Sequence, residues 1–154
     1  GMMMTFFIGA LNIKTGELIY CNASHDPPFL LKNTSKQLQK KDLILLNETN
    51  NPRLGDRREF EFRQTSMMLE PGDRIMFYTD GIMDVRNPQG ESWGERKFTR
   101  SVLKMTSMAV PDLDEAVNLL TNEIGEFRQT GSLVDDVTLF VCEYNGTDPK
   151  KAVA

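Results

Sequence analysis

The sequence predicts an α+β fold in which an antiparallel or mixed β-sheet is covered by two helices. Apolar, β-prone segments separated by Gly and Pro turns fill the first half of the chain. Two amphipathic helical patterns follow, and one more strand pattern comes after them. Strands and helices that are segregated along a chain favour helices packed on one face of a sheet. The 154 residues suit one domain. We expect residues 2–146 to form it and residues 147–154 to be a disordered tail.

The first strands are predicted from their apolar and β-branched content. Residues 5–13 and 17–21 read as two strands joined by a short turn that ends at Gly16, which is a hairpin pattern. Residues 29–31 predict a third, short strand. Residues 57–67 alternate imperfectly between charged and apolar side chains, which is typical of a half-buried strand.

A type II turn and two further strands complete the predicted sheet. Pro71 presets φ at the second position of the turn at residues 70–73, and Gly72 accepts the positive φ at the third. Residues 75–78 follow as a buried strand. Residues 137–141 are predicted to be the last strand of the chain.

Two helices are predicted from their first turns and their apolar stripes. Ser92 and Glu95 form a capping-box pattern that opens a helix reaching about Met108. Asp112 and Glu115 open a second helix in the same way, and its apolar residues recur at helical spacing.

Composition argues against several classes of function. The net charge of −4 and the pI near 5.1 disfavour nucleic acid as a partner, because phosphate backbones need a clustered basic surface. No apolar run approaches the roughly 18 residues of a membrane span, so no membrane is expected for this segment. Cys21 and Cys142 lack the spacing of metal ligands, and we interpret them as reduced core residues of a cytoplasmic protein.

Three aspartates stand at the ends of predicted strands. Asp80 follows the strand at residues 75–78, and Asp135 and Asp136 precede the last strand. If these strands are antiparallel neighbours, the carboxylates converge at one edge of the sheet. Oxygen ligands of this kind suit Mg²⁺ or Mn²⁺, and Gly81 would allow close backbone approach. Aspartate before glycine is also common in turns, so the residues alone leave a metal site and an ordinary turn open.

Five segments carry a family resemblance, in the family's order. Residues 69–82 read LEPGDRIMFYTDGI, residues 135–138 read DDVT, and residues 20–28 read YCNASHDPP. Residues 4–7 and 84–94 add weaker matches. Together they resemble the motifs of bacterial serine/threonine phosphatases of the stage II sporulation E and sigma-B regulator type. These enzymes are a branch of the PP2C superfamily, and the resemblance implies a truncated αββα sandwich.

The resemblance also implies roles for individual residues. Asp80 and Asp135 match metal ligands of a two-metal Mn²⁺ or Mg²⁺ site, in which a metal-bound water, and no side chain, is the nucleophile. Asp136 matches a supporting position where the wider superfamily carries Asn, and Gly81 supports the same turn. His25, the only histidine, matches a loop residue that we expect to order its loop by hydrogen bonding.

The sequence departs from the family pattern in three ways. Ser24 stands where the family usually has Gly, and Asp84 stands where it has Glu. An upstream G-D-h-x-G-x-G motif, which supplies further metal ligands in the family, is missing. We therefore expect a C-terminal portion of the phosphatase domain that is inactive alone. An unpaired sheet edge and an uncovered apolar face would favour self-association.

The resemblance implies dephosphorylation of a regulatory phosphoprotein, such as an anti-sigma-factor antagonist, in bacterial signalling. The alternative is a non-catalytic pseudo-phosphatase that acts as a regulatory or scaffold module. A G-D-h-x-G-x-G motif upstream of Met2 in the gene would favour the enzyme, and its absence there would favour the scaffold.

Overall fold

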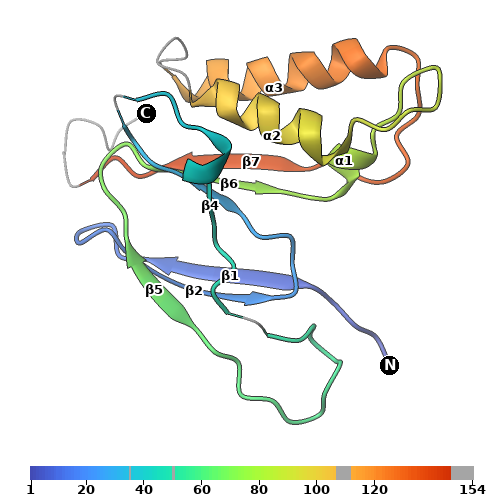
Figure 1. Ribbon diagram of the computed structural model, residues 1–154. Coiled ribbons are helices and arrows are strands. Elements are labelled where there is room, and N and C mark those ends of the chain that lie inside the picture. The colour runs from blue at the N-terminus through green and yellow to red at the C-terminus, as the bar shows by residue number, and fades with distance from the viewer. Residues whose placement is uncertain (35, 50, 107–111, 147–154) are drawn as a thin grey trace. The chain divides into compact units, whose positions relative to one another are not determined.

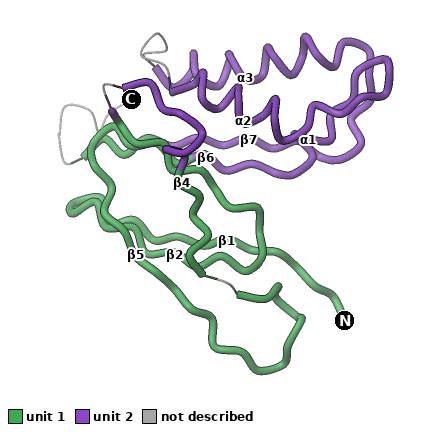
Figure 2. Tube along the Cα trace, viewed as in Figure 1, with its two compact units in different colours: residues 1–33, 44–75, 143–154 green, residues 34–43, 76–142 purple. Residues whose placement is uncertain are grey.

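A computed structural model describes residues 1–34, 36–49, 51–106 and 112–146. The tail predicted at residues 147–154 and the helix end predicted at residues 107–108 lie outside these ranges. The chain forms two compact units, shown in Figure 2. Unit 1 comprises the described residues within 1–33, 44–75 and 143–154, and unit 2 those within 34–43 and 76–142.

Unit 1 is built on a three-stranded antiparallel sheet. Its strands are β1 (Phe6–Leu11), β2 (Glu17–Ala23) and β5 (Thr65–Met68), in the order β1-β2-β5 (Figure 1). Gly16 closes the β1–β2 hairpin with φ of +81°, and its N–H donates to the carbonyl of Asn12 at 2.8 Å. The predicted hairpin is therefore confirmed.

A second, smaller strand pair also belongs to unit 1. Strand β3 (Phe29–Leu31) pairs antiparallel with β4 (Ile44–Leu45). All three residues of β3 are buried, which explains their continuous apolar run. The predicted third strand is confirmed at its predicted bounds.

The strand predicted at residues 57–67 is wrong for most of its length, since only β5 is extended there. The rings of Phe60 and Phe62 pack edge to face with centroids 5.1 Å apart. The guanidinium of Arg57 lies 5.5 Å from the centroid of Phe60. The alternation that imitates a strand thus reflects contacts between near neighbours in a loop.

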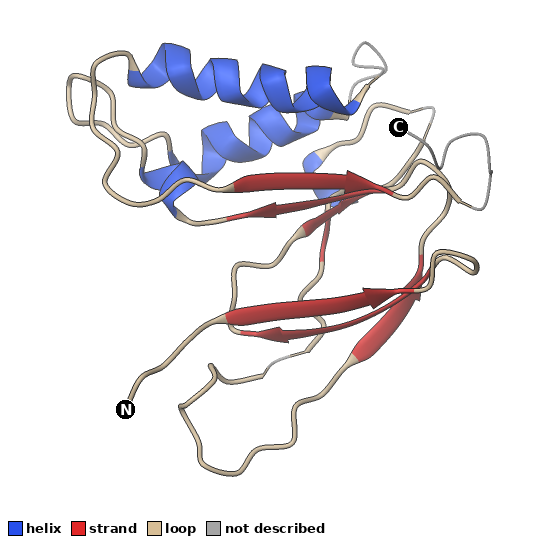
Figure 3. Ribbon diagram, turned by 180° about the vertical axis from the view of Figure 1, so that it is seen from behind, coloured by secondary structure: helices blue, strands red, loops and turns tan. Residues whose placement is uncertain are grey.

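Unit 2 contains most of the sheet pair β6–β7 and the helices. The elements are β6 (Arg74–Tyr78), α1 (Gly81–Asp84), α2 (Gly94–Met105), α3 (Leu113–Arg128), β7 (Leu139–Glu143) and the short 3-10 helix η1 (Lys40–Asp42). Strands β6 and β7 are neighbours and run in opposite directions, as Figure 3 shows. The α+β fold class predicted from the sequence is confirmed.

The helices of unit 2 pack through aromatic side chains. The ring of Phe98 on α2 meets that of Tyr78 on β6 at 4.7 Å between centroids, and Trp93 meets Phe127 on α3 at 5.1 Å. Val102 and Met105 are buried on the same face of α2 as Phe98. The apolar stripe predicted for the first helix therefore faces the sheet.

The two predicted helix starts have different outcomes. Asp112 caps α3, because its Oδ1 accepts the N–H of Glu115 at 2.7 Å. The capping box predicted at Ser92 is wrong, since α2 begins at Gly94 and its N-cap residue is Trp93. Ser92 instead forms a β-bridge with Arg86 across the preceding hairpin.

One face of the unit 1 sheet is apolar and exposed. The register places Phe6, Ile8, Ile19 and Met68 on that face, with relative exposures of 40, 56, 37 and 58%. On the opposite face, the β2 residues Leu18, Tyr20 and Asn22 are buried. Strand β1 stands at the edge of the sheet. Clustered apolar exposure beside an edge strand favours association with another chain.

We therefore expect the chain to associate with a second copy of itself through this sheet. Light scattering over a concentration series should give a mass above that of the monomer. The double substitution Ile8→Glu, Met68→Glu should restore the monomer, because it charges the exposed face and leaves the buried face intact. Phe140→Glu, at an equally exposed site on β7, is the control and should change nothing. A monomeric wild-type chain at high concentration would contradict this expectation.

Within the described ranges, no helix combines the length and the hydropathy that crossing a bilayer requires.

Candidate metal centre

Asp80 lies where β6 turns into the short helix α1. Its backbone is helical, with φ of −58° and ψ of −26°, and its carbonyl accepts the N–H of Met83 at 2.8 Å. Its side chain is exposed and makes no capping hydrogen bond to the helix. The sequence did not predict this helical turn, because Asp-Gly reads as an ordinary turn. The carboxylate of Asp80 is therefore not used to cap its own helix.

Thr79 joins the end of β6 to the chain segment that leads into β7. Its N–H donates to the carbonyl of Thr138 at 3.2 Å, and its hydroxyl donates to the carbonyl of Asp136 at 2.9 Å. The N–H of Thr138 donates to the same hydroxyl at 2.9 Å. These three bonds fix Asp80 and the Asp135–Asp136 pair at one edge of the sheet. Sequence reasoning missed this role, although Thr79 is the threonine of the T-D-G motif.

Gly81 lies directly against the segment that carries Asp135 and Asp136. A Cβ at Gly81 would stand 2.3 Å from the carbonyl oxygen of Asp136 and 3.3 Å from the carbonyl carbon of Asp135. Only a residue without a side chain allows this approach. The spacing between Asp80 and the two later aspartates therefore depends on glycine at position 81.

Replacing Gly81 by alanine should push α1 away from the Asp135–Asp136 segment. We expect a loss of about 2 kcal/mol in the free energy of unfolding, since the clash is with backbone atoms that cannot rotate away. Chemical denaturation measures this. Gly125→Ala is the matched control: Gly125 lies within α3 and its Cβ would meet nothing within 4 Å. That change should stabilise the chain by up to about 1 kcal/mol. Equal effects at both sites would contradict the packing argument.

The carboxylates at this edge are available but do not complete a metal site. Asp80, Asp135 and Asp136 are exposed, and within the described ranges none of them takes part in an ion pair. Asp135 Oδ1 accepts the N–H of Asp136 at 2.8 Å. The described residues hold no group of three His, Cys, Asp or Glu side chains close enough to bind one metal ion. The oxygen donors suit a hard cation, but further ligands are needed to hold it.

His25 lies in unit 1, in a loop that is organised by Asn22. The buried amide of Asn22 accepts the N–H of His25 at 2.8 Å and donates to its carbonyl at 3.0 Å. The Nδ1 of the His25 ring lies 2.8 Å from the carbonyl oxygen of Asp26. Most of the loop's hydrogen bonding thus comes from Asn22. Sequence reasoning passed over this residue, although it is the asparagine of the Y-x-N-A pattern.

Ser24 adopts a backbone conformation that favours glycine. Its φ is +57°, in the left-handed region that costs a side-chain-bearing residue about 1 kcal/mol. Its hydroxyl donates to the carbonyl of Asn51 at 2.8 Å, which offsets part of that cost.

Two substitutions separate the two contributions at Ser24. Both Ser24→Gly and Ser24→Ala remove the hydroxyl. The positive φ at this position is unfavourable for alanine, which has a Cβ, but not for glycine. We expect the glycine variant to be more stable than the alanine variant by about 1 kcal/mol in thermal or chemical unfolding. Equal stabilities would show that the positive φ does not constrain this position.

Asp73 stabilises a turn in unit 1 and is not part of the candidate metal centre. Its side chain is fully buried and its carboxylate accepts three hydrogen bonds in unit 1. The donors are Lys32 Nζ at 2.5 Å, the N–H of Asn33 at 2.8 Å and the N–H of Glu70 at 2.8 Å. The N–H of Asp73 closes the turn on the carbonyl of Glu70 at 2.9 Å. The P-G-D motif therefore holds together a turn, a strand end and a buried ion pair.

Solved structures define the class of protein to which this fold belongs. The chain is similar to the RsbU and RsbW domains of Rv1364c from Mycobacterium tuberculosis, with a TM-score of 0.62, 25% identity, and coverage of 90% of this chain and 35% of that chain. It is also similar to a structure of the PP2C phosphatase domain and a regulatory fragment of SpoIIE from Bacillus subtilis, with a TM-score of 0.61, 20% identity, and coverage of 89% of this chain and 36% of that chain. The catalytic domain of the phosphatase PstP in complex with two manganese ions is a more distant match (TM-score 0.51, 16% identity, 93% and 59% coverage). The fold is that of PP2C-type phosphatase domains.

The family follows from the sequence match. The model of the Stage II sporulation protein E (SpoIIE) family matches residues 1–145, so the chain belongs to that family. Protein IcfG of Synechocystis is 28% identical over 144 residues, which are 94% of this chain and 21% of that protein. Phosphoserine phosphatase RsbU of Bacillus subtilis is 28% identical over 92 residues, which are 58% of this chain and 25% of that protein. The chain thus spans about a fifth to a quarter of these relatives, and the predicted family membership is confirmed.

Proposed function

We propose that this chain is part of a metal-dependent protein serine/threonine phosphatase and carries two of its metal ligands. The main support is the set of Thr79 hydrogen bonds, which join the residue before Asp80 to Thr138 and to the carbonyl of Asp136, the residue after Asp135. Membership of the SpoIIE family and similarity to a phosphoserine phosphatase support the same reaction.

Asp80 and Asp135 would hold Mn²⁺ or Mg²⁺ through their carboxylate oxygens. Such cations lower the pKa of bound water and stabilise the charge of a phosphoryl group in transfer. Asp136 supports the site through its backbone, because its carbonyl accepts the Thr79 hydroxyl. Gly81 keeps α1 close enough for Asp80 to share the edge with Asp135. The two manganese ions of PstP support a two-metal site by analogy of fold.

The remaining ligands would come from outside this chain. The described residues supply no group of three metal-binding side chains, and hard-ion affinity depends on the number of charged ligands. The chain alone should therefore bind metal weakly and show little or no phosphatase activity.

The substrate we propose is a phosphorylated regulatory protein of the anti-sigma-factor antagonist type, dephosphorylated in the cytoplasm. The similarity to the phosphoserine phosphatase RsbU supports a phosphoserine-bearing substrate. So does the similarity to a protein in which an RsbU domain and an RsbW domain occur in one chain.

A non-catalytic scaffold remains the second candidate. One observation favours it, namely the absence of a complete ligand group within the part of the chain that the structure describes. A pseudo-phosphatase would keep the fold and the Thr79 hydrogen bonds without needing the upstream ligands.

An activity assay on the full-length gene product separates the two candidates. Hydrolysis of an aryl phosphate and of a phosphoserine peptide is measured against Mn²⁺ concentration, with this chain assayed alongside. The proposal predicts metal-dependent turnover by the full-length protein, loss of turnover with a chelator, and little or none by this chain. A full-length protein that is inert at every metal concentration would instead support the scaffold.

A further inference from the structure

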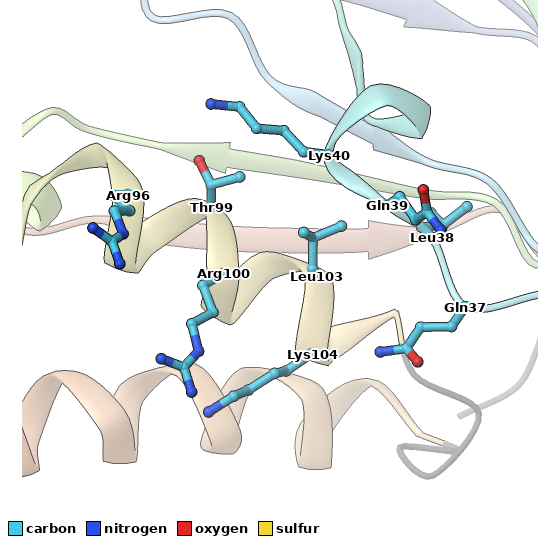
Figure 4. Close-up of a pocket in the computed structure, with 9 residues that line it drawn as sticks. All are labelled: Gln37, Leu38, Gln39, Lys40, Arg96, Thr99, Arg100, Leu103 and Lys104. Carbon is cyan, nitrogen blue, oxygen red and sulfur yellow. The ribbon is translucent and has the colours of Figure 1, made fainter.

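A basic pocket lies in unit 2, between helix α2 and the segment at residues 37–40. Its volume is about 660 Å³. Figure 4 shows Arg96, Arg100 and Lys104 along α2, with Lys40 on the opposite side of the pocket. Four of the nine lining residues are basic, although Lys and Arg make up only 18 of the 154 residues of the chain. None of the lining residues belongs to the candidate metal centre.

Three of these four basic side chains make no ion pair within the described residues. Among the described residues, the ion pairs include none of Lys40, Arg96 and Arg100. Lys104 is different, because its ammonium pairs with Glu123 on α3, which also accepts the hydroxyl of Ser101.

Glu123 on α3 offsets part of the pocket's charge, because it pairs with Lys104 and its charge also interacts with that of Arg100. Burial raises the pKa of Glu123, but hydrogen bonds from Lys104 and Ser101, with the charges of Lys104 and Arg100, lower it by more. The carboxyl of Asp42, which accepts the N–H of Gln39 at 2.9 Å, adds a second negative charge two residues from Lys40, but the four basic lining residues outnumber these two carboxylates. The pocket therefore keeps a net positive charge in a protein whose total charge is −4.

The dimensions of the pocket indicate an extended ligand. Arg96, Arg100 and Lys104 recur every four residues and so follow one side of the helix, with a span of about 12 Å. A peptide in extended conformation covers that distance in about four residues. Leu38 and Leu103 also line the pocket and give it an apolar part beside the charges.

We propose that this pocket binds a short acidic segment of a partner protein, about four residues long, whose carboxylates meet Arg96, Arg100 and Lys40 and whose apolar side chain meets Leu38 and Leu103. The net negative charge of the chain makes a long nucleic acid a poorer ligand, because the chain would repel the phosphate groups that lie outside the pocket. This inference rests on the proposed function, because the partner is taken to be the phosphoprotein substrate. That substrate would bind the pocket at a site separate from the metal centre.

A direct binding measurement tests the pocket. The probe is a fluorescein-labelled peptide with the sequence Gly-Glu-Glu-Leu-Glu-Glu-Gly, titrated with the chain and followed by fluorescence anisotropy. The double variant Arg96→Glu, Arg100→Glu should weaken binding about 30-fold, since two attractions become two repulsions. Arg53→Glu, Arg58→Glu is the matched control, because both residues are exposed in unit 1 and the net charge changes equally. This control should stay within about threefold of wild type.

Three outcomes would overturn the proposal. Equal weakening of peptide binding by both double variants would show that the effect comes from the overall charge of the chain and not from the pocket. No difference between the pocket variant and wild type would place the peptide elsewhere. Tighter binding of a DNA oligonucleotide than of the peptide, lost in the pocket variant, would replace the protein partner by nucleic acid.

The test also separates this inference from the proposed function. In the full-length protein, Arg96→Glu, Arg100→Glu should leave hydrolysis of a small aryl phosphate within about twofold of wild type, because that substrate does not need the pocket. Peptide binding without any phosphatase activity would contradict the enzyme and keep the pocket. Phosphatase activity without selective peptide binding would contradict the pocket and keep the enzyme.

Discussion

Replacing Asp73 by alanine should lower the free energy of unfolding by about 3 kcal/mol or more. The carboxylate is fully buried and accepts hydrogen bonds from Lys32, Asn33 and Glu70. Removing it leaves two backbone N–H groups without their acceptor and leaves the Lys32 ammonium only the exposed carboxylate of Glu70. Breaking a buried ion pair from one side typically costs about 3–5 kcal/mol. Urea denaturation followed by circular dichroism measures the change.

Glu70→Ala is the matched control for this prediction. Its carboxylate also approaches Lys32, at 3.4 Å, but its side chain is 73% exposed. An exposed pair of this kind contributes at most about 1 kcal/mol. Equal stability of the two variants would contradict the claim that the buried carboxylate of Asp73 holds this turn together.

The same ion pair should make stability depend on alkaline pH. Burial lowers the pKa of Lys32, but the hydrogen bond and charge of Asp73, with those of Glu70, raise it by more, so its pKa lies above the usual value. A raised folded pKa means that the stabilisation is complete below the unfolded pKa, about 10.4, and is lost as the pH rises through the folded value. In the Asp73→Ala variant this alkaline loss should become smaller, because only Glu70 then remains to raise the pKa of Lys32.

In the full-length protein, Asp80→Asn and Asp135→Asn should each reduce Mn²⁺-dependent phosphatase activity by more than about 100-fold. Loss of an outer partner of a metal ligand typically costs 10- to 100-fold in affinity or activity, so loss of a ligand itself should exceed that range. Both side chains are exposed, and within the described ranges neither takes part in an ion pair. The free energy of unfolding should therefore change by less than about 1 kcal/mol.

Asp136→Asn is the internal control for the metal ligands. Its contribution to the site is the backbone carbonyl that accepts the Thr79 hydroxyl, and asparagine keeps that carbonyl. We expect activity within about tenfold of wild type. A loss as large as that of the other two variants would make Asp136 a ligand and revise the assignment.

The sequence predicted those parts of the fold that depend on local chemistry. Gly16 and Gly72 adopt the positive φ that their turns require, and Asp112 caps its helix. Strands β3 and β6 lie where continuous apolar runs placed them. In each case the signal and the stabilising contact lie within a few residues of one another.

The errors arose where contacts between neighbours imitate another pattern. Phe60 and Phe62 alternate with charged residues as a strand does, yet they pack on each other in a loop. Ser92 has the composition of a capping residue, but a bridge to Arg86 engages it and Trp93 precedes the helix instead. Residue type alone does not reveal which of two local partners will be chosen.

The candidate site could be predicted only in part. The aspartates were found from their positions at strand ends, but the residue that unites them is Thr79, through a hydroxyl that bonds both to Asp136 and to Thr138. Threonine in a strand is common, and its function depends on a partner 57 residues away along the chain. Asn22 was missed for the same reason, because its bonds to the His25 backbone appear only once the loop is folded.

The most direct test of the central claim is Mn²⁺ binding to the full-length protein, measured by electron paramagnetic resonance of the free ion. Wild type is compared with Asp80→Asn and Asp135→Asn, and with Asp84→Asn, an exposed residue at the end of α1. If Asp80 and Asp135 hold the metal, their substitution should weaken Mn²⁺ binding at least about tenfold, whereas Asp84→Asn should leave it unchanged. Unchanged Mn²⁺ affinity in both the Asp80 and Asp135 variants would contradict the assignment of this sheet edge as a metal centre.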